Sequence, residues 1–483
     1  MVKIPKIHST KDGFIILIFF FILSRIFYYL IGIRFDITPL YWFYQFIDPQ
    51  LLKFELFKSI LYLHTQPPVF NLFLGLILKI SNNHEVLAFT LIYQIIGLLL
   101  VLNLYILMRK LNISLFVALL IAIFFTLSPP VIFFENWLFY TYPITFLVLI
   151  STVILHSYLE RQKTSHLLLF FSINALIVLT RSLFHPLWFI IICIGLIICD
   201  RGNLKRIFLC ALFPILVIGI VHFKNYMIFK QTNLSSWLGM NLAKMTMTIP
   251  LEKIESHAAV GQISGISTIM PFQEPDKYRE FANFDTLTNI HVLDQKYKSS
   301  GFLNFNNIGY ISVSQQYLKD AKYLIKKYPQ YYGLSVCKAF YAYLRPCSDS
   351  MIIRNYNRWV IKDWVDLYED YFVGDILARV WQTRFTNRYG EERKVHLNFL
   401  YIFMPALCIW GMITIIKGKD FFNYQKAQLI TISYAMFNIF YVTVAGNLIE
   451  VSENMRFRFL IVPLLYVVLA IWLKYLFNRN KRT

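Results

Sequence analysis

The hydrophobic and polar positions along the chain follow the pattern of a protein that crosses a membrane many times. Apolar runs of roughly twenty residues, the length that a helix needs to cross the hydrocarbon core, recur along the chain. No repeat of about 20 to 50 residues is evident. We therefore predict an all-α polytopic membrane protein with about ten transmembrane helices. The predicted spans are residues 13–33, 86–107, 114–134, 143–159, 166–180, 187–199, 206–222, 396–416, 424–445 and 457–476.

One apolar segment is too short for an ordinary crossing. Residues 67–80, "PPVFNLFLGLILKI", have a length that is typical of an interfacial or re-entrant helix. If this segment does not cross, then "MRKLN", "ERQKTS", "DRGNLKR", "KGKDFFNYQK" and "NRNKRT" all lie on the same side as the basic N-terminus. Because positively charged loops stay in the cytoplasm, we expect both termini there. The first apolar run lacks a cleavage site, so we interpret it as a retained span rather than a signal peptide.

The opposite face receives two long polar segments. In the first external loop, residues 34–85, apolar residues recur at helical spacing between positions 52 and 63, which predicts a helix lying in the membrane interface. Residues 223–395 contain two helical patterns broken at Pro329 and predict a small helical external domain. The chain would then consist of an N-terminal transmembrane module (1–222), this external domain (223–395) and C-terminal transmembrane helices (396–483).

Composition and charge exclude several classes of function. Hydrophobic residues form 57% of the 483 residues and aromatic residues 18%, and the formal net charge is +20. Most basic residues flank apolar spans, so the charge indicates topology rather than binding to nucleic acid. The sequence contains no Walker A motif, dinucleotide fingerprint or zinc-protease motif. Six cysteines show no metal-ligand spacing; Cys337 and Cys347 could form a disulfide in an oxidising compartment or remain free thiols.

Three acidic residues near the external face are candidates for catalysis. Asp36 follows the end of the first span, where a carboxylate that is partly withdrawn from water suits a general base acting on an acceptor hydroxyl or amine. Asp48 and Glu135 could orient the acceptor or hold a divalent cation, Mg²⁺ or Mn²⁺, so a metal cofactor is left open. For each acid the structural alternative is a solvated or helix-capping residue.

Two further residues are candidates for substrate binding near the first spans. His64 precedes the Pro67 and Pro68 pair, where it could contact substrate or end a helix. Arg181 interrupts the apolar stretch "LIVLTRSLFHPLWFI" and needs a partner, because an unpaired charge there is costly. A lipid phosphate would satisfy Arg181, and the alternative is that its side chain extends to the external headgroups.

Basic residues also lie at the external ends of later spans. Arg456 and Arg458, in "ENMRFRFLIVPLL", lie on the external side against the positive-inside tendency. Two arginines there suit bidentate binding of a phosphate or pyrophosphate, and the alternative is pairing with Glu450 and Glu453. Lys224 opens the external domain and could add a phosphate contact or anchor the helix at the interface.

Acids near the first span and basic residues near several others thus share one face. Sugar nucleotides are absent outside the cytoplasm, so an enzyme on that face would take its sugar from a lipid carrier. A polyprenyl phosphate leaving group would account for the arginines.

These segments resemble the membrane glycosyltransferases of the C-type fold, in particular the group that includes protein O-mannosyltransferases, the lipid A aminoarabinose transferase and their bacterial relatives. The resemblance is carried by the acid after the first span, by "HTQPPVFNLFLG" and by "ENMRFRFLIVPLL". It implies a polyprenyl-phosphate-linked sugar donor and Asp36 as the catalytic base. The family's histidine–proline–proline motif has two inserted residues here, and Ile37 replaces the second member of an acidic pair, which leaves Asp48 as an alternative base.

The sequence therefore predicts an integral-membrane glycosyltransferase that transfers a sugar to a lipid, glycan or protein acceptor. We expect it in a bacterial inner membrane, with its active site facing the periplasm or outside. A glycan ligase or polymerase that uses a lipid-linked oligosaccharide is one alternative. A transporter or flippase for a lipid-linked solute is another, although the charges lie at one face and no repeat of two halves is evident.

Overall fold

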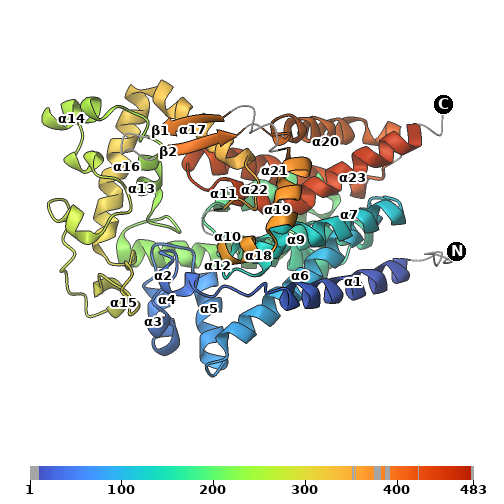
Figure 1. Cartoon of the computed structure of the whole chain (residues 1–483), viewed down its shortest axis with the longest axis horizontal. Coiled ribbons are helices and arrows are strands. Elements are labelled where there is room, and N and C mark those ends of the chain that lie inside the picture. The colour runs from blue at the N-terminus through green and yellow to red at the C-terminus, as the bar shows by residue number, and fades with distance from the viewer. Residues whose placement is uncertain are drawn as a thin grey trace.

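The computed structural model describes residues 10–350, 353, 355–374, 382–386, 392–396, 398–422 and 424–479. Nearly all of the regular structure in these residues is helical, as the hydrophobic pattern predicts (Figure 1). The described residues also include one small antiparallel hairpin, in which β1 (Gln382–Thr386) pairs with β2 (Glu392–His396).

Among the described residues, six helical segments are long and apolar enough to cross a membrane, and the chain is an integral membrane protein. A seventh crossing results if α7 and α8, which meet at a bend of 57°, form one broken span. The predicted spans at 166–180 and 187–199 correspond to α10 and α11, which are 15 and 14 residues long. The count of ten therefore stays a prediction. The helices of this bundle are α1 (Thr10–Leu30), α6 (Glu85–Lys110), α7 (Leu115–Leu127), α8 (Pro129–Glu135), α9 (Thr141–Arg161), α10 (Thr164–Val178), α11 (Pro186–Cys199), η1 (Arg201–Asn203), α12 (Leu204–Phe229), α20 (Leu400–Phe422), α21 (Lys426–Ile449), α22 (Met455–Phe459) and α23 (Val462–Arg479).

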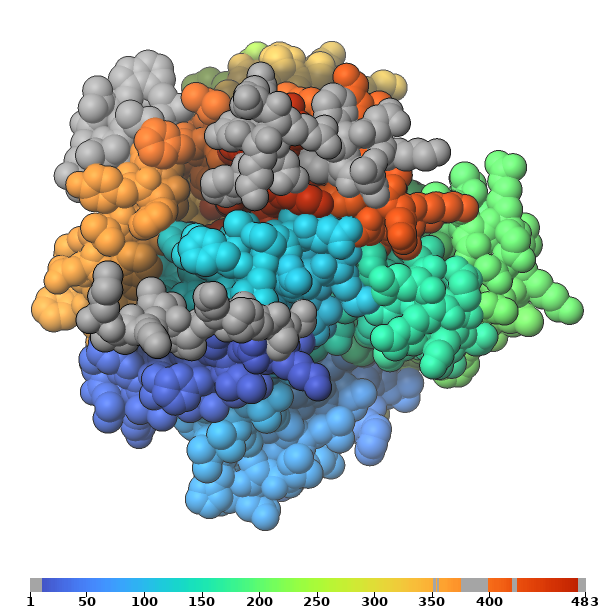
Figure 2. All heavy atoms as spheres, turned by 90° about the vertical axis from the view of Figure 1, so that its right-hand side faces the viewer, coloured from blue at the N-terminus to red at the C-terminus, as the bar shows by residue number. Residues whose placement is uncertain are grey.

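The basic connections of the bundle gather at one end. The Lys110 ammonium contacts the Glu160 carboxylate at 2.5 Å, Arg206 donates to the Gln162 carbonyl, and the Gln428 amide donates to the Lys110 carbonyl. The first turn of α1 and the last turn of α23 lie toward this side (Figure 1). Figure 2 looks onto it and shows N-terminal (blue), middle (cyan and green) and C-terminal (orange) segments meeting there. This grouping agrees with the predicted common side of the basic segments.

The helices expose apolar side chains on their outer surface, and their largely apolar interior also holds polar groups. Phe19 of α1, Phe213 of α12 and Ile402 of α20 expose most of their side chains, as expected for residues that contact lipid. Inside, the Tyr434 hydroxyl donates to the Asn174 amide oxygen at 2.8 Å and contacts the Ser151 hydroxyl at 2.9 Å. Such bonds between helices satisfy polar groups that have no water to bind.

The first external loop forms four short helices rather than one long interfacial helix. They are α2 (Pro39–Trp42), α3 (Pro49–Phe54), α4 (Leu56–Leu61) and α5 (Pro68–Ile80). The predicted single helix is wrong because the backbone leaves the helical region at Glu55 (φ −123°, ψ 36°). The predicted apolar face is buried nonetheless at Leu52, Leu56 and Leu63, and α5 packs on α3 and α4.

The large external segment is helical, and its two predicted helices meet at Pro329 as expected. Helices α13 and α16 approach so closely that a Cβ atom on Gly239 would lie 1.7 Å from the Ser314 carbonyl oxygen, so only glycine fits there. Cys337 and Cys347 are free thiols. The helices of this region are α13 (Leu238–Lys244), α14 (Leu251–Ala259), η2 (Gly265–Thr268), η3 (Pro275–Tyr278), α15 (His291–Asp294), α16 (Gly309–Lys327), α17 (Pro329–Leu344), α18 (Asn355–Val360), α19 (Lys362–Leu367) and η4 (Tyr368–Val373).

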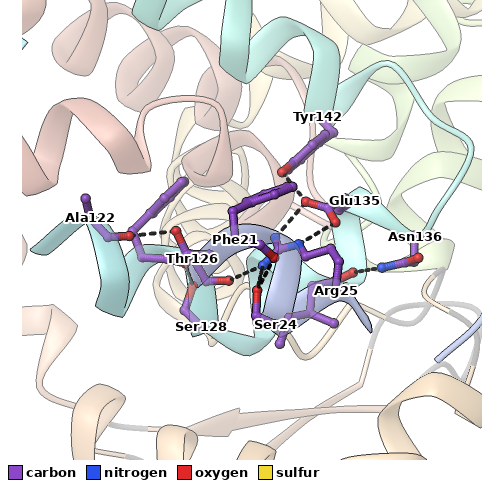
Figure 3. Close-up of polar contacts among 11 residues, drawn as sticks. Phe21, Ser24, Arg25, Ala122, Thr126, Ser128, Glu135, Asn136 and Tyr142 are labelled. Carbon is purple, nitrogen blue, oxygen red and sulfur yellow. Dashed lines mark hydrogen bonds and ion pairs between the residues drawn. The ribbon is translucent and has the colours of Figure 1, made fainter. Parts of the chain in front are cut away.

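A buried ion pair joins the first span to the end of α8 (Figure 3). The Arg25 guanidinium donates to both oxygens of the Glu135 carboxylate, at 2.8 and 2.7 Å. Its third nitrogen donates to the Ser24 hydroxyl and the Thr126 carbonyl, and the Tyr142 hydroxyl donates to Glu135 at 2.8 Å. The bidentate geometry and the added bonds offset the cost of removing both charges from water.

Removing one partner of this pair should destabilise the bundle strongly. Glu135→Gln leaves the buried Arg25 charge without compensation, so we expect a loss of about 3–5 kcal/mol in the free energy of unfolding. The double variant Arg25→Met/Glu135→Met should recover most of that loss, because neither charge remains. Thermal unfolding of the purified proteins in nanodiscs measures both effects. Equal midpoints for wild type and Glu135→Gln would contradict a structural role for the pair.

Candidate functional site

A cavity of about 400 Å³ lies where α10 and α21 end, away from the basic connections of the bundle. Most of its wall comes from residues 43–45 of the first loop, residues 181–186 between α10 and α11, residues 233–244 after α12, and residues 441–457 around the end of α21, and Gln66, Tyr140 and Phe272 complete it. We call it the arginine cavity. Its volume falls in the range of roughly 300–1,000 Å³ that is typical of small-molecule sites.

Arg181 reaches this cavity from the connection between α10 and α11. Its side chain is buried, with the guanidinium 5.0 Å from the ring centroid of Tyr140 and 4.6 Å from that of Phe457. The nitrogen Nη1 is buried and has no hydrogen-bond partner among the described residues. Burial lowers the pKa of Arg181 to about 10, and the nearby charge of Arg456 adds to this effect. The group remains cationic at neutral pH, so its solvation must come from a ligand or water.

Arg456 supplies the second guanidinium. It belongs to α22 and stacks on Phe139 at 4.7 Å, and both Nε and Nη1 are buried without a hydrogen-bond partner in the described part of the chain. Two like charges in one buried cavity repel each other unless an anion lies between them. Guanidinium donors match the oxygens of phosphates and carboxylates. The geometry therefore favours an anionic ligand.

Acidic residues line the same cavity. The Glu450 carboxylate accepts a hydrogen bond from the Lys244 ammonium at 3.2 Å, and the Glu453 carboxylate accepts one from the Ser350 hydroxyl at 3.0 Å. Burial alone raises the pKa of Glu450, but the charges of Lys244 and Arg456 outweigh it and hold the pKa below its ordinary value. Glu450 is thus ionised near neutral pH. It retains 24% of its side-chain exposure, so a ligand in the cavity could reach its carboxylate.

Asp36 and Asp48 do not line the arginine cavity. Asp36 accepts hydrogen bonds from the backbone N–H and the hydroxyl of Thr38, and its own backbone pairs with residues 136–138. Asp48 caps α3 through the Gln50 N–H and accepts two bonds at 2.6 Å from the N–H and hydroxyl of Ser299. Both carboxylates thus have structural contacts. Their catalytic roles stay predictions from the sequence, as does that of Glu135 in its ion pair with Arg25.

His64, Lys224 and Arg458 also lie outside the arginine cavity. The Lys224 ammonium donates to the Leu63 carbonyl at 2.8 Å. Arg458 points to the opposite side of α22 from Arg456, where it donates to the carbonyls of Tyr343 and Arg345. The two predicted arginines that line one cavity are therefore Arg181 and Arg456, whereas Arg456 and Arg458 do not share a cavity wall.

His64 connects the first loop to the external region. Its Nε2 contacts the Asn306 carbonyl at 3.0 Å and its Nδ1 contacts the Ser236 hydroxyl at 2.8 Å. Because a carbonyl only accepts, Nε2 carries the proton and Nδ1 accepts from Ser236. Burial lowers the pKa of His64 to about 3, so the ring is neutral when the protein is folded.

No group of three or more His, Cys, Asp or Glu side chains in the described residues has an arrangement that could hold a metal ion. The two glutamates of the arginine cavity have Lys244 and Ser350 as partners. The divalent cation considered from the sequence stays untested.

His64 predicts a pH dependence of stability. Between the folded pKa of about 3 and the ordinary value of 6.5, the unfolded chain binds the proton that the folded chain excludes, so stability falls as pH falls through this window. From pH 7 to pH 5 we expect a loss of about 2 kcal/mol, which should be absent in His64→Gln. Unfolding measured across this range tests it, with His84→Gln as the control for an exposed histidine. Equal slopes in wild type and His64→Gln would contradict the assignment.

Two of the eight predicted site residues thus meet in the arginine cavity, and the charged lining residues Lys244, Glu450 and Glu453 lie outside that prediction. The sequence could have indicated Glu450 and Glu453 as site residues, because they lie in the same external turn as Arg456. No pattern in the sequence marks Lys244 as a site residue. Comparisons with protein-family models, with curated proteins and with solved structures find no match to this chain.

Proposed function

We propose that the protein is an integral-membrane glycosyltransferase that takes its sugar from a polyprenyl-phosphate donor on the non-cytoplasmic face. The observation that carries the proposal is the pair of buried arginines in the arginine cavity, with three guanidinium nitrogens that have no hydrogen-bond partner among the described residues. The cavity lies at the end of membrane helices, where the phosphate of a membrane-anchored lipid would be found. An acceptor lipid, glycan or protein would approach from the external region.

The cavity contains the groups that such a transfer needs. The acceptor oxygen attacks the anomeric carbon while the bond from that carbon to the phosphate oxygen breaks, and the electron pair of that bond stays on the phosphate. Arg181 and Arg456 would stabilise the charge that develops there. A carboxylate would take the proton of the acceptor hydroxyl. We assign this role to Glu450, because it is ionised and more exposed than the buried Glu453.

A glycan ligase or polymerase is the second candidate. We expect such an enzyme to depend on the large external segment rather than on Asp36. Trp237 and Lys244 from that segment line the arginine cavity, whereas Asp36 does not. The two candidates share the lipid-phosphate leaving group and differ in the donor, which carries one sugar in the first case and an oligosaccharide in the second.

Replacing either cavity arginine should slow transfer strongly without loss of stability. Each charge-assisted hydrogen bond is worth about 1.5–3 kcal/mol, so Arg181→Gln or Arg456→Gln should slow transfer by about 10- to 100-fold or more. Removing a buried charge also removes its desolvation cost, so the unfolding midpoint should hold or rise. The assay supplies radiolabelled polyprenyl-phosphate sugars and lipid-linked oligosaccharides to protein in nanodiscs.

The control for this experiment is Arg279→Gln, which changes an exposed arginine of the external region that pairs with Asp276. It should transfer at the wild-type rate. Normal rates in both cavity variants would overturn the proposal. No transfer by the wild type, together with movement of a lipid-linked solute across the bilayer, would favour the transporter.

The base assignment has its own test. Loss of a general base lowers kcat by about 10²- to 10⁴-fold, so we expect this effect in Glu450→Gln. Asp36→Asn should keep kcat within a fewfold of wild type and lower the unfolding midpoint, because it loses a turn contact. The opposite result, an inactive but stable Asp36→Asn and an active Glu450→Gln, would restore the assignment that the family resemblance implies.

A further inference from the structure

A second cavity of about 420 Å³ adjoins the arginine cavity on the side of the external region. The two cavities share Tyr44, Lys244, Phe272 and Ser452 as lining residues. We call the second one the aromatic cavity, because Trp42, Tyr44, Phe272, Phe302 and Phe305 line it. A molecule in it would reach the Lys244–Glu450 pair, and hence the arginine cavity, across their shared wall.

Phe272 forms part of that wall in a strained backbone conformation. Its φ angle is +65°, in the left-handed region that bulky side chains rarely adopt. Its ring packs against Tyr44, Trp237 and Phe305 at centroid distances of 5.3 to 5.7 Å, and the Lys244 ammonium lies 4.7 Å from its centre. Such a conformation persists only where the surroundings enforce it, and such residues cluster at ligand-binding and active sites.

The aromatic cavity combines ring faces with polar groups. Phe302 is 51% exposed and Trp42 is half-buried, so both offer ring surface to a ligand. Gln273, Ser452 and Lys244 supply hydrogen-bonding groups in the same lining. A sugar ring presents C–H groups, which carry partial positive charge, to the negative face of an aromatic ring, and its hydroxyls bond to polar side chains.

We propose that the aromatic cavity is the acceptor subsite and that the acceptor is a carbohydrate. The inference rests on the proposed function and names its second substrate. The sugar ring would stack on Trp42 and Phe302, and a hydroxyl would extend past Phe272 toward Glu450. Donor phosphate and acceptor hydroxyl would thus enter from different sides of one wall and meet at the Lys244–Glu450 pair.

The test measures saccharide binding and donor chemistry separately. Saturation-transfer NMR on protein in nanodiscs, with methyl glycosides and short oligosaccharides of common hexoses and N-acetylhexosamines as probes, reports binding without turnover. Trp42→Ala and Phe302→Ala should each weaken binding by about tenfold, the value of one well-placed aromatic contact. Phe302→Leu, which keeps apolar bulk but removes the ring, should weaken it similarly. Trp359→Ala, which removes a tryptophan that is 80% exposed on α18, is the matched control.

The outcomes distinguish this inference from the proposed function. In the arginine variants, saccharide binding should persist while transfer is lost. In Trp42→Ala and Phe302→Ala, the acceptor concentration that gives half of the maximal transfer rate should rise. The rate at which these two variants release donor sugar to water should not change. Saccharide binding that is absent, or equal in all variants, overturns the carbohydrate subsite whatever the arginine variants show. Protection of Trp42 and Phe302 by a peptide or lipid acceptor instead of a saccharide also overturns it.

Discussion

The cost of burying charge is the constraint on which this structure depends. In the low-dielectric interior an unpaired ion is expensive, so buried ions must have partners. Arg25 meets that requirement through Glu135, and Arg458 does so through backbone carbonyls of the external region. Arg181 and Arg456 do not meet it within the described protein, because they leave buried nitrogens without acceptors. Their cavity is therefore where an anionic ligand would gain most from binding.

The first external loop is a scaffold for that cavity. Asp48 bonds to Ser299 and His64 bonds to Asn306, so both hold the loop against the external region. Nearby, the buried ammonium of Lys298 donates to the Phe43 carbonyl, at the start of the stretch that lines the arginine cavity. Asp48 and His64, which look functional in the sequence, thus hold the wall of the arginine cavity in position but do not line the cavity.

The sequence predicted the helical membrane bundle because apolar periodicity is a local property. It also identified Arg181 and Arg456, since an arginine in apolar surroundings is conspicuous without knowledge of its partners. The break at Glu55 was missed because Leu52, Leu56 and Leu63 keep helical spacing across it. The spacing of these buried leucines is the same whether or not one continuous helix connects them.

Roles of acidic residues are harder to predict from sequence. An acid that closes a turn and an acid that accepts a proton look alike when their contacts are unknown, as with Asp36. Glu135 has a partner 110 positions away, and no local pattern links the two. Lys244 enters the cavity through the packing of α13, which depends on the close approach at Gly239.

Charge balance explains why these residues suit a phosphodiester donor. The side chains of Arg181, Arg456, Lys244, Glu450 and Glu453 give the cavity a formal excess of one positive charge. A polyprenyl-phosphate sugar carries one negative charge and would neutralise it. When the proposed reaction frees the phosphate, the lipid gains a second negative charge while Glu450 loses its own by taking the proton. The buried cavity would therefore stay neutral throughout the reaction, as its low dielectric requires.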